Sequence, residues 1–153
     1  MDNQDQPIPL MRGDVAAICV FEPYATLAEL SGWGKKLWVP YDTPMGKTNL
    51  GFVASLKFIK ADPDLTRKIV RAHVLATKEL ADNPQIAVDT TIKQFKMSKE
   101  VAEASTRNLF FSTDTGAKFQ DGLKSLAKMM IEDKMLEREP DWAEFINTSF
   151  LPA

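Results

Sequence analysis

The sequence predicts an α/β fold in which a few strands precede a mostly helical C-terminal part. Residues 15–21 are seven apolar residues in a row between Gly13 and Pro23, which is typical of a short strand buried on both faces. Residues 50–58 alternate apolar side chains with smaller or polar ones, the period-2 pattern of a second strand. After residue 63 the apolar residues recur at helical spacing, so we expect helices from there onward.

The composition indicates one globular domain without a nucleic-acid partner. The chain has 153 residues, 44% of them hydrophobic, and a formal net charge of -2, which suits one domain with a buried core. Basic residues are scattered among acidic ones, so no patch for nucleic acid is predicted. The chain contains one cysteine and one histidine, which excludes the usual Cys/His zinc site. We expect no metal, no cofactor and no catalytic residues, and Cys19 is predicted to be a packed thiol inside the first strand.

The N-terminal part is predicted to be a lead-in followed by a strand, a turn and a helix. Residues 1–12 are polar and proline-containing, and we expect them to be flexible. The strand then stops at Glu22 and Pro23, since proline has no N–H to donate to a ladder but fits the first turn of a helix. A helix is therefore predicted over residues 24–30, ending at Gly32.

A loop-rich region follows this helix. Residues 33–48 are punctuated by glycine and proline, and residues 36–39 are the only strand candidate among them. Lys35 and Lys36 form a basic pair beside Trp33. This pair is more simply explained as a solvated turn than as a phosphate clamp.

The rest of the chain is predicted to be helical, with recognisable helix starts. Asp62 before Pro63 and Ser98 before a run of helix formers are good N-cap signals. His73 falls on or beside the apolar stripe of the longest helix, where a hydrogen-bonded core histidine is the simpler interpretation than a catalytic base. The expected helices cover residues 63–82, 84–96, 99–107, 117–135 and 142–148.

The sequence predicts too few strands to form a complete sheet around the two apolar strands. A strand that is apolar on both faces needs cover on both faces and a neighbour on each side. Residues 15–21 and 50–58 cannot satisfy each other in this way. We therefore expect part of the sheet to be missing or supplied by another chain, for example in a homodimer formed by strand pairing.

Three short motifs resemble one protein family. They are Gly-Asp-Val-Ala-Ala, four apolar residues and Glu-Pro-Tyr at 13–24; Phe-Ile-Lys-Ala-Asp-Pro-Asp at 58–64; and Ala-Asp-Asn-Pro at 81–84. Their order and spacing resemble the C-terminal half of ABC-transporter solute-binding proteins of the nitrate/sulfonate/taurine and thiamine-pyrimidine-precursor family. The resemblance covers nearly the whole chain from about Leu10 onward.

The resemblance implies a partial periplasmic-binding-protein (type II) fold. Residues 1–12 would be the lead-in and residues 13–153 a single partial solute-binding domain. Within this domain, residues 13–48 would be a remnant of the second lobe and residues 49–153 the C-terminal part of the first. The family implies a periplasmic or lipid-anchored extracellular location and an ABC permease as partner of the parent protein, although this chain shows no signal peptide.

The resemblance also implies where a small-molecule ligand would lie. Glu22, Pro23 and Tyr24 would face the ligand cleft; Trp38 could stack on a planar ligand, and Thr48 and Asn49 are weaker candidates. A carboxylate at Glu22 would accept hydrogen bonds from an amino group and repel a sulfonate, which favours an amine-bearing or uncharged ligand over a sulfonate. The alternative is that Glu22 is a helix-start acid satisfied by local N–H groups.

Three functions follow from these observations. The first is a solute-binding component of an ABC transporter, or a fragment of one, which needs no catalytic group. The second is an interaction or oligomerisation fragment without a ligand of its own. The third, an enzyme that resembles the eukaryotic thiamine-pyrimidine synthases, is disfavoured because the cysteine-rich iron-binding segment of those relatives is absent and only Cys19 is present.

Overall fold

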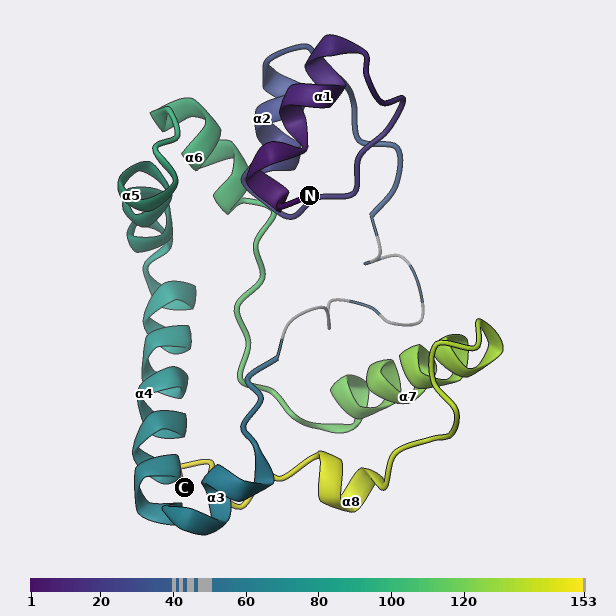
Figure 1. Cartoon of the computed structure of the whole chain (residues 1–153). Coiled ribbons are helices and arrows are strands. Elements are labelled where there is room, and N and C mark those ends of the chain that lie inside the picture. Colours follow the sequence, from purple (N-terminus) through teal and green to yellow (C-terminus); the bar gives the residue numbers. More distant parts are fainter. Residues whose placement is uncertain (40, 42, 44–45, 47–50, 153) are drawn as a thin grey trace. The chain divides into compact units, whose positions relative to one another are not determined.

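The structure, a computed structural model, describes residues 1–39, 41, 43, 46 and 51–152. Within these residues it is all-α: the regular elements are helices and there is no strand (Figure 1). The elements are the 3₁₀ helix η1 (Asn3–Asp5) and the α-helices α1 (Pro7–Arg12), α2 (Tyr24–Leu30), α3 (Leu56–Ala61), α4 (Pro63–Asp82), α5 (Pro84–Phe95), α6 (Lys99–Thr106), α7 (Ala117–Glu132) and α8 (Trp142–Phe145).

The α/β prediction is therefore wrong, and with it the partial periplasmic-binding-protein fold. Residues 15–21 form irregular backbone between α1 and α2, and residues 36–39 likewise form no strand in the part of the chain that is described. A strand exists only when a second segment completes its hydrogen-bond ladder. Among the described residues no segment pairs with residues 15–21, and the N–H of Phe21 instead donates to the Asn3 Oδ1 at 3.3 Å.

The second predicted strand is also wrong, for a local reason. Leu50 lies outside the described residues, residues 51–55 are irregular, and α3 begins at Leu56. The hydroxyl of Ser55 accepts the N–H of Phe58 at 3.1 Å, which is an N-cap bond. This cap starts a helix inside the segment whose alternation predicts a strand.

The chain forms two compact units. The first consists of residues 1–38 and 79–111, and the second of residues 39–78 and 112–153. Helix α4 contributes to both, because its last turn belongs to the first unit.

The core of the first unit is made of small side chains at helix contacts. Helix α5 packs on α6, α6 on α2, and α2 on α1. Small residues let helix backbones approach closely, but they bury little apolar area. The buried apolar side chains of this unit are Ala28, Ala87, Val88, Val101 and Ala102.

Helix starts and ends in the first unit follow the predicted signals closely. Helix α2 spans the predicted residues 24–30, and Gly32 adopts the left-handed φ of 72° that closes it. The N–H of Trp33 donates to the Ala28 carbonyl at 3.0 Å and that of Gly32 to the Glu29 carbonyl at 3.1 Å, the pair of bonds of a Schellman motif. Helix α6 begins as predicted, with the Ser98 hydroxyl accepting the N–H of Val101 at 3.3 Å.

The first twelve residues contain more structure than the predicted lead-in. They form η1 and α1, and Pro7 at the start of α1 is buried. Gly13, with a φ of 77°, closes α1 in the left-handed conformation. Cys19, predicted to be packed, is exposed, because the segment around it enters no sheet among the described residues.

The second unit contains α3, most of α4, α7 and α8. The predicted cap of α4 is confirmed: the Asp62 Oδ1 accepts the N–H of Leu65 at 2.8 Å. His73, predicted on or beside the buried stripe, is exposed and stacks on the half-exposed Phe52, with ring centroids 5.1 Å apart. The less exposed side of α4 instead contains the buried Thr66 and the partly buried Ile69, Val70 and Val74.

Two predicted helices of the second unit end early. Helix α7 stops at Glu132 rather than at residue 135, and α8 stops at Phe145 rather than at residue 148. The Asp141 carboxylate caps α8 by accepting the N–H groups of Ala143 and Glu144. No helix in the described ranges is both long enough and apolar enough to cross a membrane.

Candidate functional site

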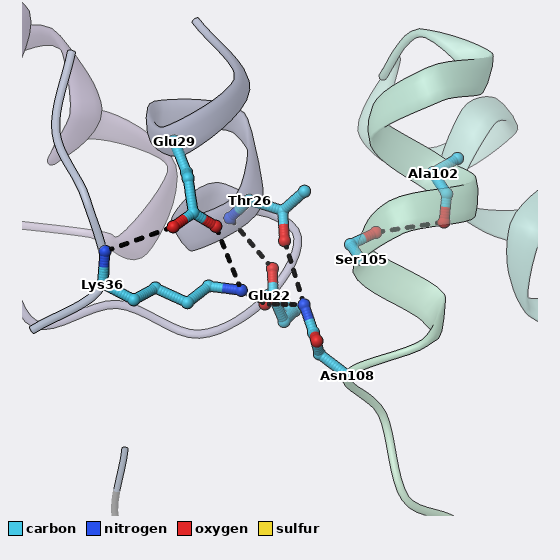
Figure 2. Close-up of polar contacts among 7 residues, drawn as sticks. All are labelled: Glu22, Thr26, Glu29, Lys36, Ala102, Ser105 and Asn108. Carbon is cyan, nitrogen blue, oxygen red and sulfur yellow. Dashed lines mark hydrogen bonds and ion pairs between the residues drawn. The ribbon is translucent and has the colours of Figure 1, made fainter. Parts of the chain in front are cut away.

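A polar cluster at the junction of α2 and α6 contains the predicted site residue Glu22. Figure 2 shows its side chains converging on the Glu22 carboxylate. We call this set the Glu22 cluster; its members are Glu22, Thr26, Glu29, Lys36 and Asn108.

The Glu22 carboxylate is engaged through both oxygens. Its Oε2 accepts the backbone N–H of Thr26 at 3.1 Å. Its Oε1 accepts the Asn108 Nδ2 at 2.8 Å and lies 3.2 Å from the Lys36 Nζ. The Glu22 side chain is only 13% exposed, so its charge is held by protein donors more than by water.

The sequence around α2 explains why Glu22 takes this position. Pro23 is buried and directly precedes the helix, so Glu22 stands just before the free N–H groups of the first turn. A helix N-terminus favours a negative charge, and the Thr26 N–H supplies the bond. The alternative interpretation of Glu22, as a helix-start acid satisfied locally, is thus confirmed for one of its two oxygens.

Lys36 reaches the cluster because the chain reverses after α2. The Schellman motif at Gly32 turns the backbone, and the Lys36 N–H donates to the Glu29 Oε1 at 3.4 Å. The Lys36 Nζ then lies between two carboxylates, 3.2 Å from Glu22 and 3.7 Å from Glu29. Its side chain is 29% exposed and Lys36 as a whole is an exposed residue, which agrees with the predicted solvated turn, although its ammonium group is paired with carboxylates.

Asn108 connects the cluster to α6, 86 residues along the chain from Glu22. It follows the last turn of α6, where its N–H donates to the Ser105 carbonyl at 3.0 Å. Its Nδ2 donates to the Glu22 Oε1 and also to the Thr26 Oγ1 at 3.2 Å. Thr26 is 2% exposed, so Asn108 satisfies a buried hydroxyl as well as a carboxylate.

The cluster can hold a positively charged or hydrogen-bond-donating group. It combines two carboxylates with one ammonium, which leaves a net charge of about -1 around Lys36. In the part of the chain that is described, no group of three or more His, Cys, Asp or Glu side chains could hold a metal ion. The arrangement thus presents the acceptor oxygens of two carboxylates, both of which pair with the Lys36 ammonium group.

The other predicted site residues have different surroundings. Pro23 is buried, and Tyr24 packs edge-on against Phe95, with ring centroids 6.3 Å apart. Tyr24 also lines a shallow surface depression with residues 1–4. Trp38 is 69% exposed. Thr48 and Asn49 lie outside the described residues.

Sequence reasoning missed four of the five members of the cluster. Thr26 and Glu29 follow Glu22 at the i+4 and i+7 spacing that puts residues on one side of a helix, so this spacing was a readable signal. Lys36 and Asn108 carry no such signal, because a chain reversal and an interhelical contact bring them in.

A scan against protein-family models, a search of the curated proteins and a search of the solved structures each gave no match to this chain. The resemblance to solute-binding proteins therefore stays a prediction from the three motifs.

Proposed function

We propose that this chain is the solute-binding component of an ABC transporter, or a fragment of one, for a small organic solute. The observation on which this rests most is the Glu22 cluster. The residue that the resemblance assigns to the ligand is the residue on which polar groups from α2, from Asn108 just after α6 and from the chain reversal converge (Figure 2). Oriented acceptors of this kind suit recognition of a solute without chemical change.

The cluster favours some solutes of the proposed class over others. The class comprises sulfonates, nitrate or taurine-like anions, and thiamine pyrimidine precursors. A nearly buried carboxylate with a net negative surrounding attracts amino groups and repels simple anions. We therefore propose an amine-bearing solute, such as a pyrimidine precursor with an exocyclic amino group or an aminosulfonate bound through its amine.

The remaining parts of the proposal come from the resemblance. The parent protein would present the solute to an ABC permease, in the periplasm or on a lipid anchor outside the cell. It would bind rather than catalyse, since the cysteine-rich segment of the synthase relatives is absent from this sequence.

A thermal-shift screen of the full chain tests this function. The ligands are thiamine pyrimidine precursors, taurine, alkanesulfonates and nitrate. A ligand at 100 times its Kd stabilises the folded state by about 2.7 kcal/mol, so a true ligand raises the unfolding midpoint in a saturable way. The shift should be lost in Glu22→Gln, which keeps the size of the side chain but removes its charge. Absence of a shift with every ligand would contradict the proposed function for this chain.

A second function, an interaction or oligomerisation fragment, is favoured by a separate observation. Large apolar side chains stand exposed in the first unit, including Phe21 at 52% and Leu37 at 79%. Exposed apolar side chains mark surfaces that associate with a partner where they form a contiguous patch. We propose pairing of residues 15–21 between two copies as the form this association takes.

A further inference from the structure

We propose that the Glu22 cluster is a binding site for a primary ammonium group and that Lys36 occupies it as an internal ligand. This inference deepens the proposed function and rests on it. It narrows the amine-bearing solute already proposed to one that presents a primary ammonium group, and it adds a competitor within the chain that must leave first.

The acceptor side of the site does not depend on Lys36. The Glu22 carboxylate is oriented by the Thr26 N–H at 3.1 Å and by the Asn108 Nδ2 at 2.8 Å. Asn108 is in turn fixed by its bond to the Thr26 Oγ1. The carboxylate therefore keeps its direction when the ammonium leaves, which lowers the ordering cost of binding another one.

The charge around the ammonium selects for a cation. The Lys36 Nζ lies within 4 Å of Glu22 and Glu29 together. Without it, two carboxylates would face the same space with no positive charge between them. An ammonium carries three N–H donors and can bond to both carboxylates at once, whereas a neutral alcohol of the same length offers one donor and no charge.

Apart from the ion pairs of the Lys36 ammonium group, few contacts among the described residues hold the segment that carries Lys36 in place. Its backbone bond to the Glu29 Oε1 is long, at 3.4 Å. The next residues, Leu37 and Trp38, are 79% and 69% exposed, so their displacement from this position uncovers little apolar surface. The Lys36 side chain is itself 29% exposed, which gives water and a small ligand access to the site.

An internal ligand lowers the apparent affinity for an external one. The apparent Kd equals the intrinsic Kd divided by the fraction of molecules in which the site is open. Removal of the Lys36 ammonium should therefore raise the affinity for an external ammonium, by about tenfold if Lys36 occupies the site for about 90% of the time.

The test uses n-butylammonium, which reproduces the lysine side chain beyond its Cβ–Cα bond. It is titrated into the wild-type chain, Lys36→Ala and Lys36→Met, with thermal unfolding and the NMR signals of the Asn108 side-chain amide as readouts. Both Lys36 variants should bind it saturably and about tenfold more tightly than the wild type. Lys36→Met retains most of the aliphatic packing, so it keeps the test valid if Lys36→Ala unfolds.

Three controls decide the interpretation. The neutral isostere n-butanol and the donor-free cation tetramethylammonium should leave the Lys36 variants unchanged. The double variant Glu22→Gln/Lys36→Met should not bind n-butylammonium. Equal responses to n-butylammonium and tetramethylammonium, or binding that survives Glu22→Gln, would overturn the inference.

Failure of this inference is distinguishable from failure of the proposed function. A transported solute that shifts the wild-type chain while n-butylammonium never binds the Lys36 variants overturns only the ammonium site. Binding of n-butylammonium that depends on Glu22, without a shift from any solute in the screen, supports the ammonium site and counts against the transport function.

Discussion

Asn108 makes the contacts that join the end of α6 to Glu22 and Thr26 at the start of α2. Its Nδ2 donates to a carboxylate oxygen of Glu22 and to the buried hydroxyl of Thr26. If one partner of a hydrogen bond is removed, the little-exposed polar group that remains has neither a protein partner nor water. The resulting loss of stability is larger than the net contribution of the hydrogen bond itself. The site is thus most sensitive at a residue that does not need to contact the ligand.

We expect Asn108→Ala to lower the free energy of unfolding by about 1–3 kcal/mol, the usual cost of an unsatisfied buried polar group. Asn108→Asp should cost at least as much, since a new carboxylate would face Glu22. Urea unfolding followed by circular dichroism measures both. Asn83→Ala is the matched control, because Asn83 is exposed and makes no side-chain cap bond to α5. An Asn108→Ala variant as stable as this control would contradict the assigned bonds.

At the scale of elements, α2 and the reversal after it bring Lys36 back to Glu22. The reversal depends on Gly32, whose φ of 72° is left-handed. A β-carbon at Gly32 would meet no atom within 4 Å, so any cost of a side chain there comes from the backbone alone. The left-handed conformation of Gly32 therefore decides whether the segment from Trp33 onward turns back towards α2.

We expect Gly32→Ala to destabilise the chain by about 1–2 kcal/mol, the cost of the left-handed conformation for a residue with a β-carbon. Gly51→Ala is the control, since its β-carbon also meets nothing within 4 Å but its φ is not left-handed. That variant should be neutral or more stable by about 0.4–1 kcal/mol, through the unfolded state. Chemical unfolding of the two variants in parallel measures the difference. Equal effects would show that backbone strain at Gly32 is unimportant.

At the scale of the whole molecule, the described residues bury few large apolar side chains. The buried apolar residues are alanines and valines, whereas Phe21, Leu37 and Phe145 are more than half exposed. Burial of large apolar side chains is the main favourable term in folding, at about 1.5–3 kcal/mol for each side chain. These exposed residues are therefore available for contact with a partner, either a second copy of this chain or the proposed permease.

We expect the purified chain to self-associate in a concentration-dependent way through residues 15–21. Phe21→Asp should weaken the association by about tenfold or more, because a charge would enter the paired segment, where its desolvation costs about 1.4 kcal/mol or more. Phe145→Asp is the control: Phe145 is 61% exposed, comparable to Phe21 at 52%, but belongs to the second unit. Sedimentation velocity across a dilution series measures the masses. A wild-type monomer at every concentration, or equal effects of both substitutions, would contradict pairing through this segment.

The sequence by itself determined most helix boundaries and the position of Glu22. Helices α2, α4, α5 and α6 begin and end within one residue of the predicted positions, and Asp62 and Ser98 cap the predicted starts. Helix hydrogen bonds and caps join residues three to five positions apart, so a short stretch of sequence contains both partners of each bond.

Only the tertiary structure decided the fold class and the composition of the candidate site. Residues 15–21 have the apolar side chains typical of a buried strand, but a strand forms only when a distant segment supplies the other half of its hydrogen-bond ladder. Lys36 and Asn108 join Glu22 through a chain reversal and through a contact 86 residues away. The partners in these interactions are far apart in the chain, and no local pattern records that they meet.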